Sequence, residues 1–190
     1  MARSGHGKQS YLGFAEAGDR TGFDQAPFSV FRPAFIEALS LLARACDEVA
    51  AKGFERPILV GGAAVEFHTG SAVVSGDFDF VAEDQRAFED ALISYGFRRE
   101  DRPGWLLRGL YHPELSLGVE FVSGLLFDGR SDVQRVQLVE IVDGKAVAIA
   151  PVEDLIADRL GQYASGTAPE MLGQAIKLFQ LADRLDEAYP

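Results

Sequence analysis

The sequence is poor in cysteine and in long apolar runs. Its 190 residues include a single cysteine, Cys46, which excludes a disulfide within the chain and a cysteine-rich zinc site. The longest apolar stretches, such as GKAVAIAPV, are far shorter than the roughly 20 residues that a membrane helix needs. The N-terminus, MARSGHGKQSYLGF, lacks the apolar segment of a signal peptide. We therefore expect a cytoplasmic protein without a membrane-embedded part.

Basic charge is also scarce. The chain has 18 Lys and Arg against 29 Asp and Glu, a net charge of −11. A protein that binds a long phosphate backbone needs clustered Lys and Arg, whereas the longest basic cluster here, FRREDRPGWLLRG, is interrupted by acids. A long nucleic acid is therefore a disfavoured partner. A small anionic ligand that is carried with a divalent metal ion remains compatible with this charge.

The length and the hydrophobic content of 47% are typical of one globular domain with a sizeable core. Residues 1–27 are rich in Gly and polar residues without periodicity, which predicts a loose N-terminal arm. Residues 28–150 read as an α/β core, and residues 151–190 as a C-terminal helical pair packed on it. We thus expect an α+β fold, in which helices flank a short mixed β-sheet.

Hydrophobic periodicity and turn residues predict the individual elements. A helix is expected from Pro33 to just before Gly53, because Pro favours the first turn of a helix and Gly follows its end. Asp143-Gly144 is a hairpin signal. The other expected helices cover residues 63–69, 84–95, 152–165 and 169–189; the expected strands cover 57–60, 77–82, 97–100, 105–112, 117–124, 134–142 and 145–150.

The segment DFDFV carries two acids in an otherwise apolar run. In a strand, Asp77 and Asp79 share one face at about 7 Å, and Phe78 and Phe80 point the other way into the core. Two carboxylates on one face repel each other unless a cation lies between them. Mg²⁺ prefers oxygen ligands and often binds carboxylates together with substrate phosphates. The alternative is a solvated strand end, since SGD is also a turn sequence.

A third acid and a glycine pair extend this candidate site. Glu120 is the single charge on its face of LGVEFVS and would converge with the aspartates if the two strands were neighbours. Otherwise it has an exposed or structural role. Gly61 and Gly62 would let the backbone and a helix N-terminus approach phosphate, or would merely close a tight turn. Ser75 would donate its hydroxyl to the same phosphate, or would cap a turn.

The segments VGGAAVEFHTG, SGDFDFV and GVEFV together resemble the nucleotidyltransferase superfamily of DNA polymerase beta type. The family motif is a Gly-Gly or Gly-Ser pair, a short helix, Asp-x-Asp and a third acid on a later strand. The closest group is that of the minimal nucleotidyltransferases and the abortive-infection toxin-like proteins. The segment APVEDLIADRLGQYA resembles the helix after their catalytic sheet, where a lysine commonly stands at the position of Arg159.

The resemblance implies a nucleotidyltransferase fold with a C-terminal helical pair, and transfer of a nucleoside monophosphate from an NTP to a hydroxyl. The acceptor would be a small molecule, a protein or an RNA end. The implied site has Asp77, Asp79 and Glu120 as catalytic ligands of two Mg²⁺ ions and Gly61, Gly62, Ser75 and Arg159 as nucleotide-binding residues. Arg159 has an ordinary surface charge as its alternative. The rival function is a non-catalytic interaction module with a protein partner, of antitoxin or regulator type.

Overall fold

The computed structural model of the chain describes residues 29–99, 109–122, 125–182, 185–186 and 188. The expected N-terminal arm and the first part of the expected strand 105–112 lie outside these residues. The helices are α1 (Pro33–Ala51), α2 (Gly61–His68), α3 (Gln85–Ser94), α4 (Val152–Ala164) and α5 (Met171–Leu181). The strands are β1 (Ile58–Val60), β2 (Asp77–Val81), β3 (Arg98–Arg99), β4 (Gly109–His112), β5 (Leu117–Phe121), β6 (Gln137–Val142) and β7 (Lys145–Ile149).

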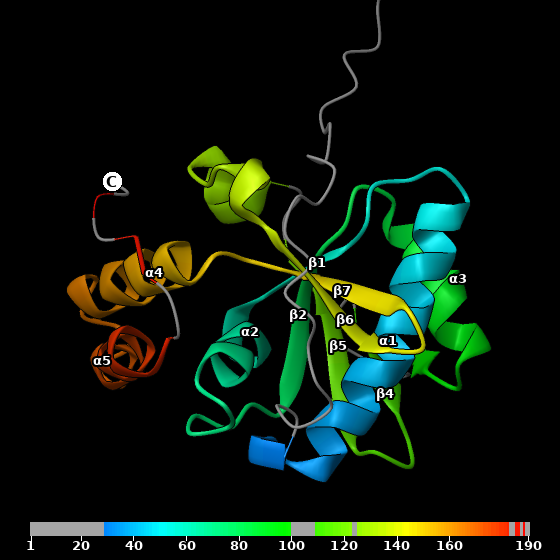
Figure 1. The fold of residues 1–190 in the computed structure, drawn as a ribbon, viewed down its shortest axis with the longest axis horizontal. Coiled ribbons are helices and arrows are strands. Elements are labelled where there is room, and N and C mark those ends of the chain that lie inside the picture. The colour runs from blue at the N-terminus through cyan, green and yellow to red at the C-terminus, as the bar shows by residue number, and fades with distance from the viewer. Residues whose placement is uncertain (1–28, 100–108, 123–124, 183–184, 187, 189–190) are drawn as a thin grey trace, which may run out of the picture.

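One mixed sheet forms the centre of the molecule (Figure 1). Its seven strands have the order β3-β4-β5-β2-β1-β7-β6. The β2–β5 and β1–β7 pairs are parallel, and the remaining pairs are antiparallel. The expectation of an α+β fold with a mixed sheet flanked by helices is confirmed. The expectation that the sheet is short was wrong, because all the strands, including β3 and β6 at the edges, join one seven-stranded sheet.

The local elements follow the sequence signals closely, with two exceptions. Asp143 and Gly144 both have positive φ angles, 49° and 74°, as the turn between β6 and β7 requires. Residues 134 and 135, expected as the start of a strand, belong to a 3-10 turn, Val133–Arg135, because the Asp132 carboxylate accepts from the Gln134 N–H. The last helix ends at Leu181 rather than near residue 189. The chain leaves the helix there, and further on the Asp186 N–H donates to Glu153 of α4.

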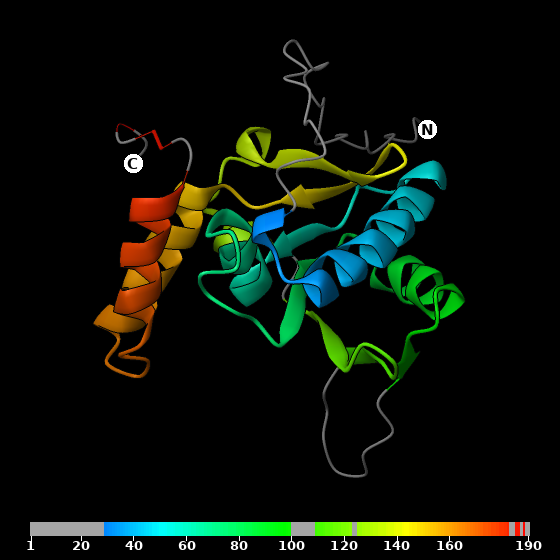
Figure 2. The same ribbon diagram turned by 60° about the horizontal axis from the view of Figure 1, so that its bottom comes forward.

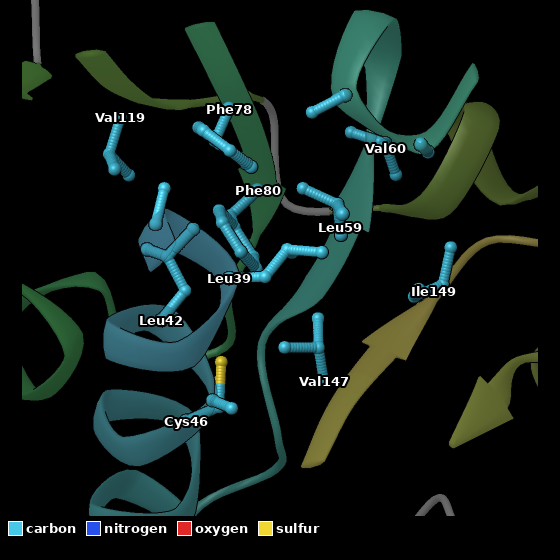
Figure 3. Close-up of a cluster of buried hydrophobic side chains, with 14 of the residues drawn as sticks. Leu39, Leu42, Cys46, Leu59, Val60, Phe78, Phe80, Val119, Val147 and Ile149 are labelled. Atoms are coloured by element: carbon cyan, nitrogen blue, oxygen red, sulfur yellow. The ribbon is translucent and has the colours of Figure 1, made fainter. Parts of the chain in front are cut away.

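The core lies between the sheet and the helices α1 and α3, which are on the same side of the strands in Figure 1. Phe35 of α1 stacks on Phe78 of β2 with ring centroids 5.5 Å apart, and Phe80 meets Phe88 of α3 at 5.0 Å. Figure 3 shows the two β2 phenylalanines among the buried side chains of α1, β1, β5 and β7. Because side chains alternate along a strand, Asp77 and Asp79 must lie on the opposite face.

The helices α4 and α5 pack against each other on the other side of the sheet (Figure 2). The shorter helix α2 follows β1 directly and packs against β1, β2 and both of these helices. In the part of the chain that the structure describes, no helix is long and apolar enough to cross a bilayer. The arrangement leaves the aspartate face of β2 bordered by the start of α2 and by α4.

Candidate functional site

The three predicted acids meet on one face of the sheet. Asp79 of β2 is the register partner of Glu120 on the parallel strand β5. Paired residues on neighbouring strands point to the same face, so Glu120 joins the two aspartates there. Asp77 lies over Gly118, where an added Cβ would come within 2.5 Å of its Oδ1. Asp77 and Glu120 are exposed, and Asp79 is half-buried between them.

The electrostatic surroundings of Asp79 are unfavourable for its charge. Burial and the nearby carboxylates of Glu120 and Asp77 raise the pKa of Asp79. The Gly62 N–H, which donates to this carboxylate, and the guanidinium of Arg159 act in the opposite direction without reversing the shift. A cation held against this face would remove the repulsion. The face is therefore a concentration of negative charge that the protein itself does not neutralise.

Steric contacts explain why residues 61 and 62 are both glycine. Gly61 has a φ of +62°, in the left-handed region, and an added Cβ would overlap the Asp79 carboxylate. At Gly62 an added Cβ would lie 2.6 Å from the Ser75 Oγ. The missing side chains thus let the first turn of α2 approach β2 and the segment before it. The structure places Gly61 against Asp79 and Gly62 against Ser75.

A cavity of about 400 Å³ opens beside Asp79. Gly61 and Asp79 line it from the sheet side, and Arg159 and Gln162 line it from α4. The half-buried Phe127 and neighbouring apolar side chains form another wall. The volume is within the range of small-ligand sites, and the lining combines an apolar wall with a few polar groups, as such sites do.

Arg159 is a buried charge, not a surface one. Only 5% of the residue is exposed, which excludes the alternative of an ordinary surface charge. Its Nη1 donates to Asp158 at 2.8 Å, whereas its Nε has no hydrogen-bond partner among the described residues. A buried donor without an acceptor costs free energy, and a ligand with acceptor oxygens in the cavity would supply that acceptor.

A second cavity of about 510 Å³ adjoins the first and shares Phe127, Asp158 and Gln162 with it. Asp154 and Arg130 also line this cavity. Phe127 and the next residue have φ angles of 47° and 58°, which non-glycine residues rarely adopt. Such strained backbone is concentrated at ligand sites in proteins. No sequence pattern indicated this turn as part of the site.

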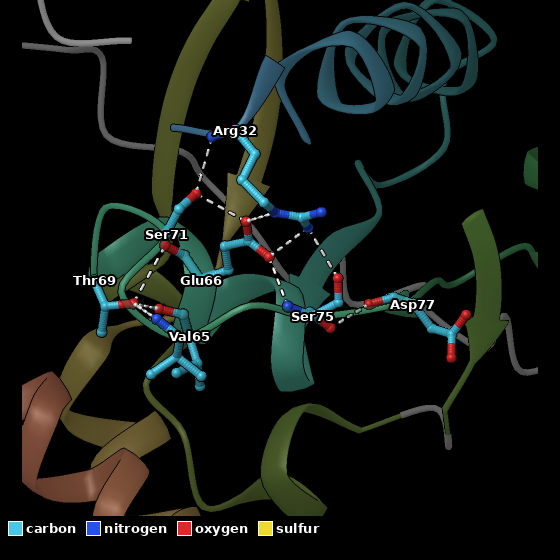
Figure 4. A network of polar contacts seen from close by, with 8 residues as sticks. Arg32, Val65, Glu66, Thr69, Ser71, Ser75 and Asp77 are labelled. Atoms are coloured by element: carbon cyan, nitrogen blue, oxygen red, sulfur yellow. Dashed lines mark hydrogen bonds and ion pairs between the residues drawn. The ribbon is translucent and has the colours of Figure 1, made fainter. Parts of the chain in front are cut away.

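Sequence reasoning also missed Glu66, whose side chain is completely buried. It accepts hydrogen bonds from Arg32, Ser71 and the Ser75 backbone, as Figure 4 shows. Burial opposes its charge, but the Arg32 and serine donors outweigh burial and lower the pKa of Glu66 below its ordinary value. The available signal was the single charge in the apolar stretch GGAAVEF, next to the candidate site.

Asp77, Asp79 and Glu120 form an acidic face whose donor set suits Mg²⁺. In the part of the chain that the structure describes, no three His, Cys, Asp or Glu side chains form a ready-made metal cage. Mg²⁺ is usually bound by one or two carboxylates, with waters and substrate phosphates completing its shell. Asp79 with either exposed neighbour meets that requirement, and the mutual repulsion of the three acids favours a cation between them.

The chain matches no protein-family model and no curated protein sequence. The nucleotidyltransferase resemblance therefore depends on the motif residues alone and stays a prediction. The observations that any function must accommodate are the three acids on one face, the buried Arg159 and the two adjoining cavities.

Proposed function

We propose that this protein is a Mg²⁺-dependent nucleotidyltransferase that moves a nucleoside monophosphate from an NTP to an acceptor hydroxyl. The observation that carries the proposal is the register between β2 and β5, which sets Glu120 beside Asp79 with Asp77 on the same face. Of these acids, Asp79 lines a cavity whose other side holds the buried Arg159. Acids that bind metal ions and a guanidinium that binds phosphate are the two charge types that a triphosphate needs.

Each residue has a role in this proposal. Asp77 and Asp79 hold the metal ions, and Arg159 donates to phosphate oxygens through its unpartnered Nε. The Gly61–Gly62 turn lines the triphosphate path, and Ser75, whose hydroxyl donates to the Asp77 carbonyl oxygen, supports that turn from behind. Bound Mg²⁺ supplies charge neutralisation and polarises the phosphoryl group. Most of the rate enhancement then comes from positioning and from charge compensation.

The chemical step is an in-line displacement at the α-phosphorus. Glu120, exposed at the edge of the acidic face, accepts the proton of the acceptor hydroxyl. The hydroxyl oxygen forms the new bond to the α-phosphorus while the bond from that phosphorus to the bridging oxygen of the β-phosphate breaks. Pyrophosphate leaves with the electron pair of the broken bond, so that atoms and charge balance.

The second cavity favours a small acceptor. Its volume of about 510 Å³ and its contact with the first cavity provide room for a second small substrate next to the transferred group. The net charge of −11 disfavours a long nucleic acid. A protein side chain or an RNA end that reaches the same opening is the other acceptor class compatible with this site.

The test is calorimetric titration with non-hydrolysable ATP, CTP, GTP and UTP analogues, once with Mg²⁺ and once with EDTA. We expect Mg²⁺-dependent binding of at least one analogue, lost in the double variant Asp77→Asn/Asp79→Asn. Asp90→Asn is the matched control, because Asp90 is an exposed aspartate of α3. Absence of binding by folded wild-type protein would overturn the proposal.

The helical pair favours a second candidate, a non-catalytic interaction module. Leu160 and Tyr163 of α4 and Ile176 and Phe179 of α5 are each 43% exposed or more. Exposed apolar side chains on adjoining helices are typical of protein-binding surfaces. Under this alternative, the wild-type protein binds no nucleotide but binds a protein partner. Ile176→Lys or Phe179→Lys would weaken that association, whereas substitutions of Asp77, Asp79 or Glu120 would leave it unchanged.

A further inference from the structure

Glu66 uses both of its carboxylate oxygens to hold the segment in front of β2. Arg32 donates to Oε1 from Nε at 2.7 Å and to Oε2 from Nη2 at 2.8 Å. The Ser71 hydroxyl donates to Oε1 at 2.8 Å, and the Ser75 backbone N–H donates to Oε2 at 2.6 Å. Four hydrogen bonds equal the number of lone-pair sites on a carboxylate. The acceptor capacity of Glu66 is thus filled.

The same network also binds the backbone carbonyl of Ser75. Arg32 donates from Nη2 to the Ser75 carbonyl oxygen at 2.9 Å, so both polar groups of the Ser75 backbone are held (Figure 4). The Ser75 hydroxyl in turn donates to the carbonyl oxygen of Asp77 at 2.8 Å. The chain of contacts therefore runs from the buried Glu66 to the first residue of β2, which carries an acid of the site.

We infer that Glu66 and Arg32 are positioning residues that hold Ser75 beside the Gly61–Gly62 turn and, through Ser75, hold Asp77 at the start of β2. Neither residue lines the cavity next to Asp79, so both act through Ser75. That this positioning serves an NTP rests on the proposed nucleotidyltransferase function. The hold on Ser75 itself rests only on the hydrogen bonds.

The contacts of Glu66 favour positioning over simple stabilisation of the core. Its neighbours on α2, Ala63, Ala64 and Val65, are completely buried and supply the packing of that helix. A buried ion pair often contributes little more stability than apolar residues of the same size. Glu66 instead fixes the segment between α2 and β2, where Arg32 is joined to Ser75 across 43 positions of the sequence.

Amide hydrogen exchange tests the hold on Ser75 without any substrate. In Glu66→Gln we expect the Ser75 amide to exchange about tenfold faster, the effect of weakening a hydrogen bond to a charged acceptor. The amides of Leu59 and Val147 in the central strands serve as internal reference. A Ser75 amide that exchanges faster than the central strands, through local opening, and about tenfold faster again in the variant supports positioning. No acceleration at Ser75, or a Ser75 rate equal to that of the central strands in both proteins, overturns it.

Arg32→Gln provides a second variant, because the Arg32 side chain is 33% exposed and its loss is easier to tolerate. It should accelerate the Ser75 amide as Glu66→Gln does. Ser71→Ala is the matched control: it removes the hydrogen bonds of the Ser71 hydroxyl to Glu66 and to the Arg32 backbone N–H, and leaves both contacts to the Ser75 backbone. Its Ser75 amide should exchange at nearly the wild-type rate.

Nucleotide titration then separates this inference from the proposed function. In both variants that release Ser75 we expect the Kd of the Mg²⁺-bound NTP analogue to rise about tenfold, with Ser71→Ala unchanged. Unchanged affinity despite a released Ser75 overturns the substrate-positioning role and leaves the proposed function intact. No binding by the wild type overturns the proposed function, and hydrogen exchange alone then decides whether Glu66 and Arg32 hold Ser75.

Discussion

Glu66 and Asp79 are carboxylates on the packed elements α2 and β2, in opposite electrostatic surroundings. Glu66 is completely buried, yet Arg32 and the serine donors lower the pKa of its carboxyl despite that burial. Asp79 is only half-buried, yet burial together with Glu120 and Asp77 raises the pKa of its carboxyl. The more deeply buried group is the one whose charge is better stabilised.

The difference shows that the donors around a carboxylate, more than its depth, decide what it does. Glu66 has its full set of hydrogen bonds and no capacity left for a ligand, so it is suited to hold other groups. Asp79 faces two further acids and retains charge that the protein does not compensate, so it is suited to bind a cation. Satisfied charge favours a structural or positioning role, and uncompensated charge favours binding.

Of the substitutions considered, removal of the Glu66 charge should have the largest effect on the free energy of unfolding. We expect Glu66→Gln to lower the free energy of unfolding by about 3 kcal/mol, because Arg32 loses its charge partner in a buried contact. Urea unfolding followed by circular dichroism at neutral pH measures it. A loss of less than about 1 kcal/mol would mean that solvent reaches Arg32 well enough to replace the ion pair.

Acid should weaken the same network. The pKa of Glu66 is lowered in the folded state, so its charged form contributes stability above the ordinary value of 4.5, and this contribution is lost as the pH falls through the lower folded-state pKa. The stability difference between wild type and Glu66→Gln should therefore shrink below pH 4.5. Unfolding free energies measured over a pH series test this. A difference that grows in acid contradicts the direction of the shift.

Removal of the Asp79 charge should change the free energy of unfolding in the opposite direction. Without metal ions, Asp79→Asn should raise the free energy of unfolding by about 0.5 kcal/mol, because it removes repulsion between like charges on neighbouring strands. Thermal unfolding in EDTA measures this gain, with Asp90→Asn as the neutral comparison. Added Mg²⁺ should stabilise the wild type more than Asp79→Asn. Destabilisation of the variant in EDTA would show that the Gly62 N–H outweighs the neighbouring acids.

An exposed carboxylate should have the smallest effect. Glu48 of α1 pairs with Lys52 at 2.8 Å, and both side chains are at least 36% exposed. Glu48→Gln should change the free energy of unfolding by less than about 0.5 kcal/mol, since solvent screens such pairs. Urea unfolding under the conditions used for Glu66→Gln allows the changes in the free energy of unfolding of the two variants to be compared directly. A change as large as that of Glu66→Gln would remove the distinction between buried and exposed carboxylates.

Local pattern in the sequence by itself determined several features of this protein. The alternation in DFDFV placed the two aspartates on one face and the phenylalanines in the core. Pro33 marked the start of α1, and Asp143-Gly144 marked the hairpin between β6 and β7. These predictions succeeded because helix ends, strand faces and tight turns depend on residues a few positions apart.

Only the tertiary structure decided which distant residues meet. The register that sets Glu120 beside Asp79, the burial of Arg159 and the reach of Arg32 to Ser75 are not visible in any local pattern. That all seven strands join one sheet and that α5 ends early were missed for the same reason. Strand order and register result from the packing of segments far apart in the chain, whereas periodicity reports only which face of a segment is apolar.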